Sequence, residues 1–144
     1  MWIILSLSAS VLWGLTYVVD EQIYRRISVF SSLAIASLCV FLVMLAASYI
    51  SGSLGKDIAV LSSSRRVLAL VLCGAATLLT AELLIGLSIS SKNATLAALI
   101  EISYPLFVAT FAVLLFNEER PNVMTVVGGV LILGGVFLIS YFNL

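Results

Sequence analysis

Histidine is absent from this sequence of 144 residues, and charged residues are scarce. Without histidine, the chain lacks the commonest metal ligand and the commonest acid–base catalyst. Charged residues make up 10% of the chain and hydrophobic residues 62%, whereas a soluble domain is about a quarter charged. No basic patch of the kind that binds nucleic acid is present. We therefore expect no metal, no cofactor and no nucleic-acid partner.

Cysteine is also rare, and no cleavable leader is evident. Cys39 and Cys73 both lie in apolar stretches, so we expect ordinary buried thiols and not a disulfide bridge. The N-terminal segment has no basic residues before its apolar stretch, which continues to Val19 without a clear stop. It reads as a first membrane span and not as a signal peptide.

Long apolar stretches dominate the rest of the chain. Each is about as long as a helix that crosses a hydrocarbon layer of ~30 Å. Lipid cannot satisfy free backbone groups, and stretches without strict alternation favour helices over strands. The predicted fold class is an all-α membrane protein, a bundle of five transmembrane helices in a single transmembrane domain, residues 1–144. The predicted spans are about 2–19, 29–50, 67–87, 94–116 and 123–142.

The connections are short, so neighbouring spans should run antiparallel. The segment 51–66 is the only long connection, and its Asp57–Leu61 stretch is predicted to lie in the membrane interface. The N-terminal side of the membrane would carry Lys56, Arg65, Arg66 and Arg120, and the opposite side Arg25, Arg26 and Lys92. This bias slightly favours a cytoplasmic N-terminus. It is also compatible with dual insertion and an antiparallel homodimer, and both readings stay open.

Two glutamates stand inside apolar stretches. Glu82 precedes, and Glu101 follows, the turn that joins the third and fourth spans, each at roughly 12–14 Å along its helix. We expect them at matching depth. A charged acid near the bilayer centre costs ~2.5–3.5 kcal/mol, so their presence indicates proton or cation coupling. The alternative is that each is a neutral acid hydrogen-bonded to a neighbouring helix.

Pro105 lies four residues after Glu101 in the fourth span. Proline has no N–H, so the Glu101 carbonyl loses its helical partner. Unpaired carbonyls of this kind occur at ion and substrate sites in broken helices. Small residues on the same face, Ala94, Ala97 and Ala98, predict close helix packing there.

Aromatic and glycine positions complete the candidate set. Trp13 and Tyr17 belong to a polar and aromatic stripe on the first span, and Tyr104 lies on the Glu101 face; we predict that they line a substrate path. Helix packing explains the serines of the stripe, Ser6 and Ser10. In the last span, Gly128 and Gly135 are seven residues apart and predict a helix-packing face, within one protomer or at a dimer seam.

Three stretches, "LWGLTYVV", "NATLAALIEISYPLFVATFAVLLFNEE" and "GGVLILGGVFL", together resemble the drug/metabolite transporter superfamily in its EamA-type branch. Members look like ten spans built from two five-span repeats of opposite orientation, and this chain resembles one repeat. The resemblance implies a multi-pass protein of the cell membrane that acts as a homodimer. The residues that carry it are Trp13, Gly14, Ala97, Ala98, Pro105, Glu118 or Glu119, Gly128 and Gly135.

The leading hypothesis is therefore a secondary transporter protomer that moves a small organic metabolite or drug, with proton or cation coupling at Glu101 and Glu82. The alternative is a non-transporting membrane subunit or a lipid-carrier flippase partner. An intramembrane enzyme is disfavoured, because the sequence has no histidine and no nucleophile–base pair.

Overall fold

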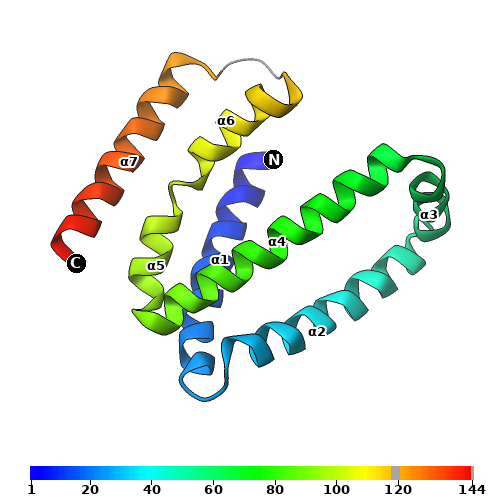
Figure 1. Cartoon of the computed structure of the whole chain (residues 1–144), viewed down its shortest axis with the longest axis horizontal. Coiled ribbons are helices and arrows are strands. Elements are labelled where there is room, and N and C mark those ends of the chain that lie inside the picture. Colours follow the sequence, from blue (N-terminus) through cyan, green and yellow to red (C-terminus); the bar gives the residue numbers. More distant parts are fainter. Residues whose placement is uncertain (118–120, 144) are drawn as a thin grey trace. The chain divides into compact units, whose positions relative to one another are not determined.

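The computed structural model describes residues 1–117 and 121–143, and this part of the chain is all-helical (Figure 1). Five of its helices are long and apolar enough to cross a membrane, when the two-part helix Ala94–Phe116 is counted as one. This result confirms the predicted all-α membrane class. The helices are α1 (Trp2–Tyr24), α2 (Val29–Ile50), α3 (Leu54–Ser63), α4 (Arg65–Ser91), α5 (Ala94–Glu101), α6 (Tyr104–Phe116) and α7 (Val123–Asn143).

Two helices extend beyond the predicted spans. Helix α1 continues to Tyr24, about a turn past the predicted end at Val19, and α4 occupies 65–91 where 67–87 was expected. Most of the added residues are polar, but none is a glycine or proline that would stop a helix. The predicted ends followed hydropathy, which marks where contact with lipid ends, whereas the helices themselves continue further. Glu21 consequently lies on α1 and not in a loop.

The long connection between the second and third spans contains a helix of its own. Only an interfacial stretch was predicted in this connection, whereas Leu54–Ser63 forms helix α3. Gly52 adopts a positive φ of 70° in the turn that precedes α3, a conformation that glycine accepts at no steric cost. Ser64, in extended conformation, ends α3 and leads directly into α4.

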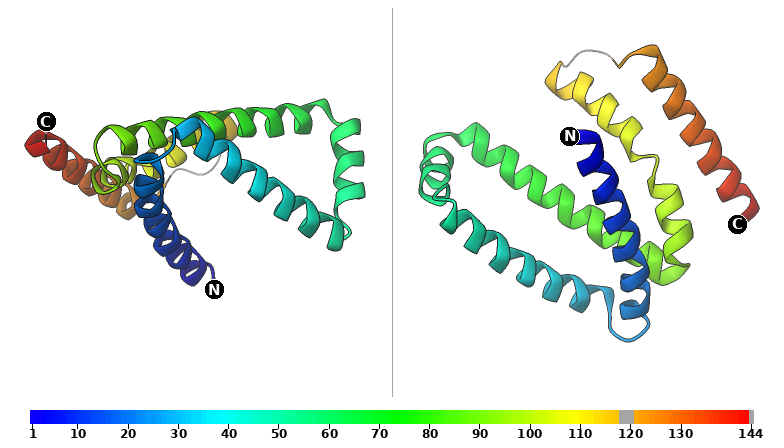
Figure 2. Two further views of the ribbon diagram at one scale, coloured as in Figure 1. Left: turned by 90° about the horizontal axis from the view of Figure 1, so that it is seen from below. Right: turned by 180° about the vertical axis from the view of Figure 1, so that it is seen from behind.

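The chain divides into two compact units, each described separately below. The central unit is Gln22–Ser90 and contains α2, α3 and most of α4. Ser28 caps α2 by accepting a hydrogen bond from the Ser31 backbone N–H at 3.2 Å. The start of α2 meets the end of α4, because a Cβ on Gly86 would lie 2.7 Å from Cγ1 of Val29. From there α2 and α4 diverge, and α3 spans their open end (Figures 1 and 2).

The terminal unit is Met1–Glu21 together with Ser91–Leu144. It contains most of α1 and all of α5, α6 and α7. Helix α7 runs back alongside α5 (Figure 1), and the Lys92 ammonium group donates to the Asn143 carbonyl oxygen at 3.2 Å. Ala94 and Ala97 on α5 are buried, in agreement with the close packing expected of small residues on this helix.

Most apolar side chains of the described residues are exposed, as expected for helices that face lipid. The buried hydrophobic side chains among them are Val29, Ile89, Ala94 and Ala97. Cys39 and Cys73 are free thiols and both are exposed, so the expectation that they are buried was wrong. Leu38, Val40 and Leu72, their apolar neighbours in sequence, are exposed as well.

Candidate functional site

Glu101 is the last residue of α5, at a break in the fourth span. The helix begins at Ala94 and is capped by Asn93, whose side chain accepts from the Leu96 N–H at 2.8 Å; it ends as Ile102 and Ser103 turn out of it. Pro105 stands in the first turn of α6, where a proline is tolerated, and supplies no N–H to the Glu101 carbonyl. The structure therefore has the break that the proline predicts, directly beside the Glu101 carboxyl.

The Glu101 carboxyl is hydrogen-bonded to α1. The Tyr17 hydroxyl donates to Oε2 of Glu101, and both side chains are half-buried. Among residues 1–117 and 121–143, Tyr17 is the partner found for this carboxyl, and no lysine or arginine pairs with it. Within the part of the chain that the structure describes, this acid has a hydroxyl that orients it and no cationic side chain that pairs with it. Such an arrangement is compatible with a site for a proton or an external cation.

Trp13 continues the site along α1. Its ring centroid lies 5.8 Å from that of Tyr17, with the ring planes at 52°. This is a tilted aromatic pair next to a carboxyl, an arrangement that can contact a flat or cationic molecule. Trp13 is 49% exposed and Tyr104, at the start of α6, is 59% exposed. Tyr17 thus contacts both Glu101 and Trp13. Among the described residues, no hydrogen bond or ring contact joins Tyr104 to these three side chains. The substrate path therefore stays a prediction.

A second acid of α1 also reaches α5, and the sequence analysis missed it. Oε2 of Glu21 accepts a hydrogen bond from the Ala94 N–H at 2.8 Å, at the first residue of α5. Glu21 was assigned to a loop because the apolar stretch ends before it. Its spacing was the available signal: it lies four residues after Tyr17 and thus on the same face of a continued helix.

Glu82, the other predicted coupling residue, lies on α4 in the central unit. Its side chain is half-buried and has an interaction partner. Glu82 and Glu101 belong to different units, so the expectation that they lie at matching depth stays a prediction. The serines of the α1 stripe have a simple role: Ser6 and Ser10 donate to the carbonyls of Trp2 and Ser6, one turn back, at 3.0 Å each.

The close approach of α7 to α6 involves a different glycine from those predicted. A Cβ on Gly129 would lie 2.0 Å from Cδ2 of Leu106, whereas a Cβ on Gly128 or Gly135 would meet no atom within 4 Å. Within the described part of this chain, then, Gly129 is the packing position. Gly128 lines the space between α6 and α7, and the proposal that Gly128 and Gly135 form a helix-packing face stays a prediction.

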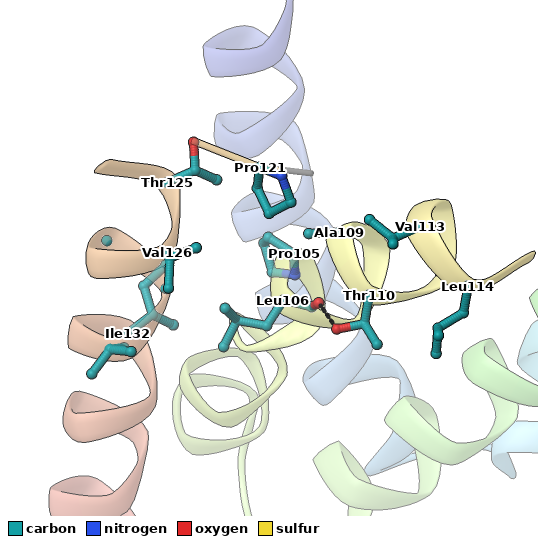
Figure 3. A pocket seen from close by; sticks show the side chains of 13 residues that line it. Pro105, Leu106, Ala109, Thr110, Val113, Leu114, Pro121, Thr125, Val126 and Ile132 are labelled. Carbon is teal, nitrogen blue, oxygen red and sulfur yellow. Dashed lines mark hydrogen bonds between the residues drawn. The ribbon is translucent and has the colours of Figure 1, made fainter. Parts of the chain in front are cut away.

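A cavity of about 570 Å³ lies between α6 and α7 (Figure 3). Pro105, Leu106 and Thr110 line it from α6, and Thr125, Gly128 and Gly129 from α7. Its two threonine hydroxyls are already used: Thr110 donates to the Leu106 carbonyl at 2.8 Å, and Thr125 to Oδ1 of Asn122 at 3.0 Å. The cavity is therefore apolar in its chemistry, and it does not include Trp13, Tyr17, Tyr104 or Glu101.

Comparison with known families identifies the family to which this chain belongs. The profile of the EamA-like transporter family matches residues 1–141. The chain belongs to the EamA-like transporter family. It is thus an integral membrane protein of a family of small-molecule transporters, as the resemblance of its three stretches implied. No curated protein and no solved structure gives a significant match.

Several of the residues that carry the EamA resemblance lie on the helices that contain Tyr17 and Glu101 or next to them. Trp13 and Gly14 lie on α1, Ala97 and Ala98 on α5, and Pro105 at the start of α6. Ala97 is buried, with 4% of its surface exposed, and Pro105 follows the helix break. Glu118 and Glu119 lie outside the described residues.

Proposed function

We propose that this EamA-like protein is a secondary transporter protomer that moves a small organic metabolite or drug across the cell membrane. Glu101 binds the proton or cation that drives transport, and Glu82 assists. The observation that supports this assignment is the hydrogen bond from Tyr17 to the Glu101 carboxyl at the α5–α6 break. A charged acid in the span raises the free energy of membrane insertion by ~2.5–3.5 kcal/mol. A role in coupling would explain why the sequence has an acid there despite this cost.

The substrate path runs, in this proposal, along the aromatic side chains beside Glu101. Trp13 and Tyr17 form a tilted pair on α1, and Tyr104 follows Glu101 by three residues at the start of α6. Aromatic faces contact flat and cationic molecules well and leave the carboxyl accessible to a proton. The protein is then a carrier that performs no covalent chemistry.

The proposal includes a homodimer in the lipid bilayer. In transporters built from repeats, the substrate site lies between two repeats. The described residues contain five candidate spans, the number expected for one repeat, so a second copy would supply the other repeat and complete the site. The open faces of Gly128 and Gly135 have no atom within 4 Å of an added Cβ and leave room for a close helix partner.

Uptake by proteoliposomes tests the proposal. Purified protein is reconstituted, and uptake of labelled amino acids, sugars, nucleobases and the organic cation ethidium is measured with and without a pH gradient. We expect at least one class to accumulate in response to the gradient. Glu101→Gln should abolish that response while the protein still inserts, because glutamine keeps the size of the side chain and loses the titratable group.

Two results would contradict the proposal. One is gradient-driven uptake by Glu101→Gln at the wild-type rate, which would remove Glu101 from the mechanism. The other is an absence of uptake for every class together with an obligate second chain in the purified complex, which would favour a non-transporting subunit or a flippase partner.

A further inference from the structure

Helix α5 is attached to α1 at both of its ends. At its N-terminus, the Ala94 N–H donates to Oε2 of Glu21 at 2.8 Å. At its C-terminus, the Glu101 carboxyl accepts from the Tyr17 hydroxyl. Tyr17 and Glu21 are four residues apart on α1 and therefore lie on the same helix face. One face of α1 thus contacts the first and the last residue of an eight-residue helix.

The contact from Glu21 differs from the ordinary cap of α5. Asn93 already caps this helix locally, with its Oδ1 atom 2.8 Å from the Leu96 N–H. Glu21 pairs a different first-turn N–H, and does so from another helix. A carboxylate at a helix N-terminus interacts favourably with the helix dipole, and charge-assisted hydrogen bonds are the stronger kind. The Glu21 contact therefore fixes where α5 lies along α1, which the Asn93 cap does not do.

The other end of α5 has no helical continuation to fix its position. The helix stops at Glu101, and Pro105 cannot donate to the Glu101 carbonyl. Helix α6 therefore does not hold Glu101 in register by helical hydrogen bonds. The position of the Glu101 carboxyl depends on the packing of α5 against α7 and on its attachment to α1.

We propose that Glu21 is a positioning residue for coupling: its carboxylate holds the N-terminus of α5 on α1, and so brings the Glu101 carboxyl to the Tyr17 hydroxyl. Glu21 acts through α5 and makes no contact with the transported molecule. Its effect on transport rests on the proposed function, whereas its effect on the Tyr17–Glu101 hydrogen bond does not.

Infrared difference spectroscopy of the full chain in lipid tests this inference without any substrate. Acid-minus-neutral spectra of the wild type contain the carbonyl band of protonated Glu101, identified by its loss in Glu101→Gln. Tyr17→Phe defines the position of this band when the hydrogen bond is absent. We expect Glu21→Ala to move the band to the Tyr17→Phe position. Glu21→Gln, which keeps an oxygen that can accept from Ala94, should restore the wild-type position.

The matched control is Asn93→Ala, which removes the other cap of the same helix and leaves α1 unchanged. It should lower the unfolding temperature but keep the wild-type band. If Glu21→Ala does not fold, Glu21→Ser, whose hydroxyl is too short to reach Ala94, takes its place. An unshifted band in the Ala or Ser variant, or an equal shift in Asn93→Ala, would overturn the inference. A shifted band together with normal gradient-driven uptake by Glu101→Gln would reject the proposed function and leave this inference standing.

Discussion

At the scale of single residues, the account depends on how Tyr17 and Glu101 pair. A hydroxyl can donate to a carboxylate and can also hydrogen-bond a protonated acid, so it serves Glu101 in both protonation states. An arginine in the place of Tyr17 would hold the carboxyl permanently ionised. The hydroxyl therefore orients the acid without supplying a fixed positive charge beside it, which suits a coupling site.

Tyr17→Phe removes that hydroxyl and keeps the ring against Trp13. A hydrogen bond to a charged group contributes ~1.5–3 kcal/mol, so we expect gradient-driven uptake to fall on the order of tenfold or more. The initial rate in proteoliposomes measures this. Tyr141→Phe, on α7 with 67% of Tyr141 exposed, is the control and should transport normally. Equal rates for the two variants would show that the Tyr17 hydroxyl has no part in transport.

At the scale of helices, the division of the fourth span into α5 and α6 is the distinctive element. Pro105 removes the hydrogen bond that would join the two segments at Glu101. A broken helix can change its angle at the break, and irregular backbone within a membrane occurs where it lines a cavity or a site.

Pro105→Ala should make the fourth span more continuous, because alanine supplies the missing N–H and favours helix. We expect an unfolding temperature at or above the wild-type value. We also expect uptake to be reduced several-fold, because the helix can no longer change its angle at the break beside Glu101. Circular dichroism melting and the uptake assay measure the two quantities. Uptake at the wild-type rate would show that the break has no role in transport.

Glycines on α4 offer a paired test of helix packing in the central unit. An added Cβ at Gly86 would lie 2.7 Å from Cγ1 of the buried Val29, whose branched side chain has little rotational freedom. Gly86→Ala should therefore cost about 1–3 kcal/mol of stability. Gly74→Ala on the same helix meets no atom within 4 Å and should leave stability unchanged or raise it by up to about 1 kcal/mol. Thermal melts that rank the two variants in the opposite order would contradict this packing.

At the scale of the whole molecule, the exposed apolar surface and the family assignment describe a helical protein that belongs in lipid. Most large apolar side chains of residues 1–117 and 121–143 are exposed, and five candidate spans cover most of this sequence. Lipid can cover such helices, but a substrate site must also be enclosed by protein. In our proposal, a second copy of the chain provides the other side of that site.

Native mass spectrometry of the detergent-solubilised protein should show twice the mass of the 15.4 kDa chain. A reporter that functions on one side of the membrane only, fused to the C-terminus, then distinguishes the two forms of dimer. Activity of both a cytoplasmic and an external reporter indicates antiparallel copies, and activity of one indicates a single orientation. A stable monomer that still transports would remove the dimer from the account.

The sequence predicted the helices better than the contacts between them. Apolar length located the five spans, and Pro105 located the break, because both are local properties of the chain. The helix α3 was missed because its apolar stretch is too short to signal a span. Glu21 was missed because hydropathy marks the lipid boundary and not the end of α1. The Tyr17–Glu101 bond joins residues 84 apart in the chain, and helical spacing on each segment gives no information about such a pairing.

Proton movement that accompanies transport tests the central claim most directly. Proteoliposomes that contain the pH indicator pyranine and hold wild-type or Glu101→Gln protein are given a compound that the wild type accumulates. The account predicts a change in internal pH on addition to the wild type and none with Glu101→Gln. An equal change with both proteins would show that the proton is carried elsewhere and that Glu101 is not the coupling residue.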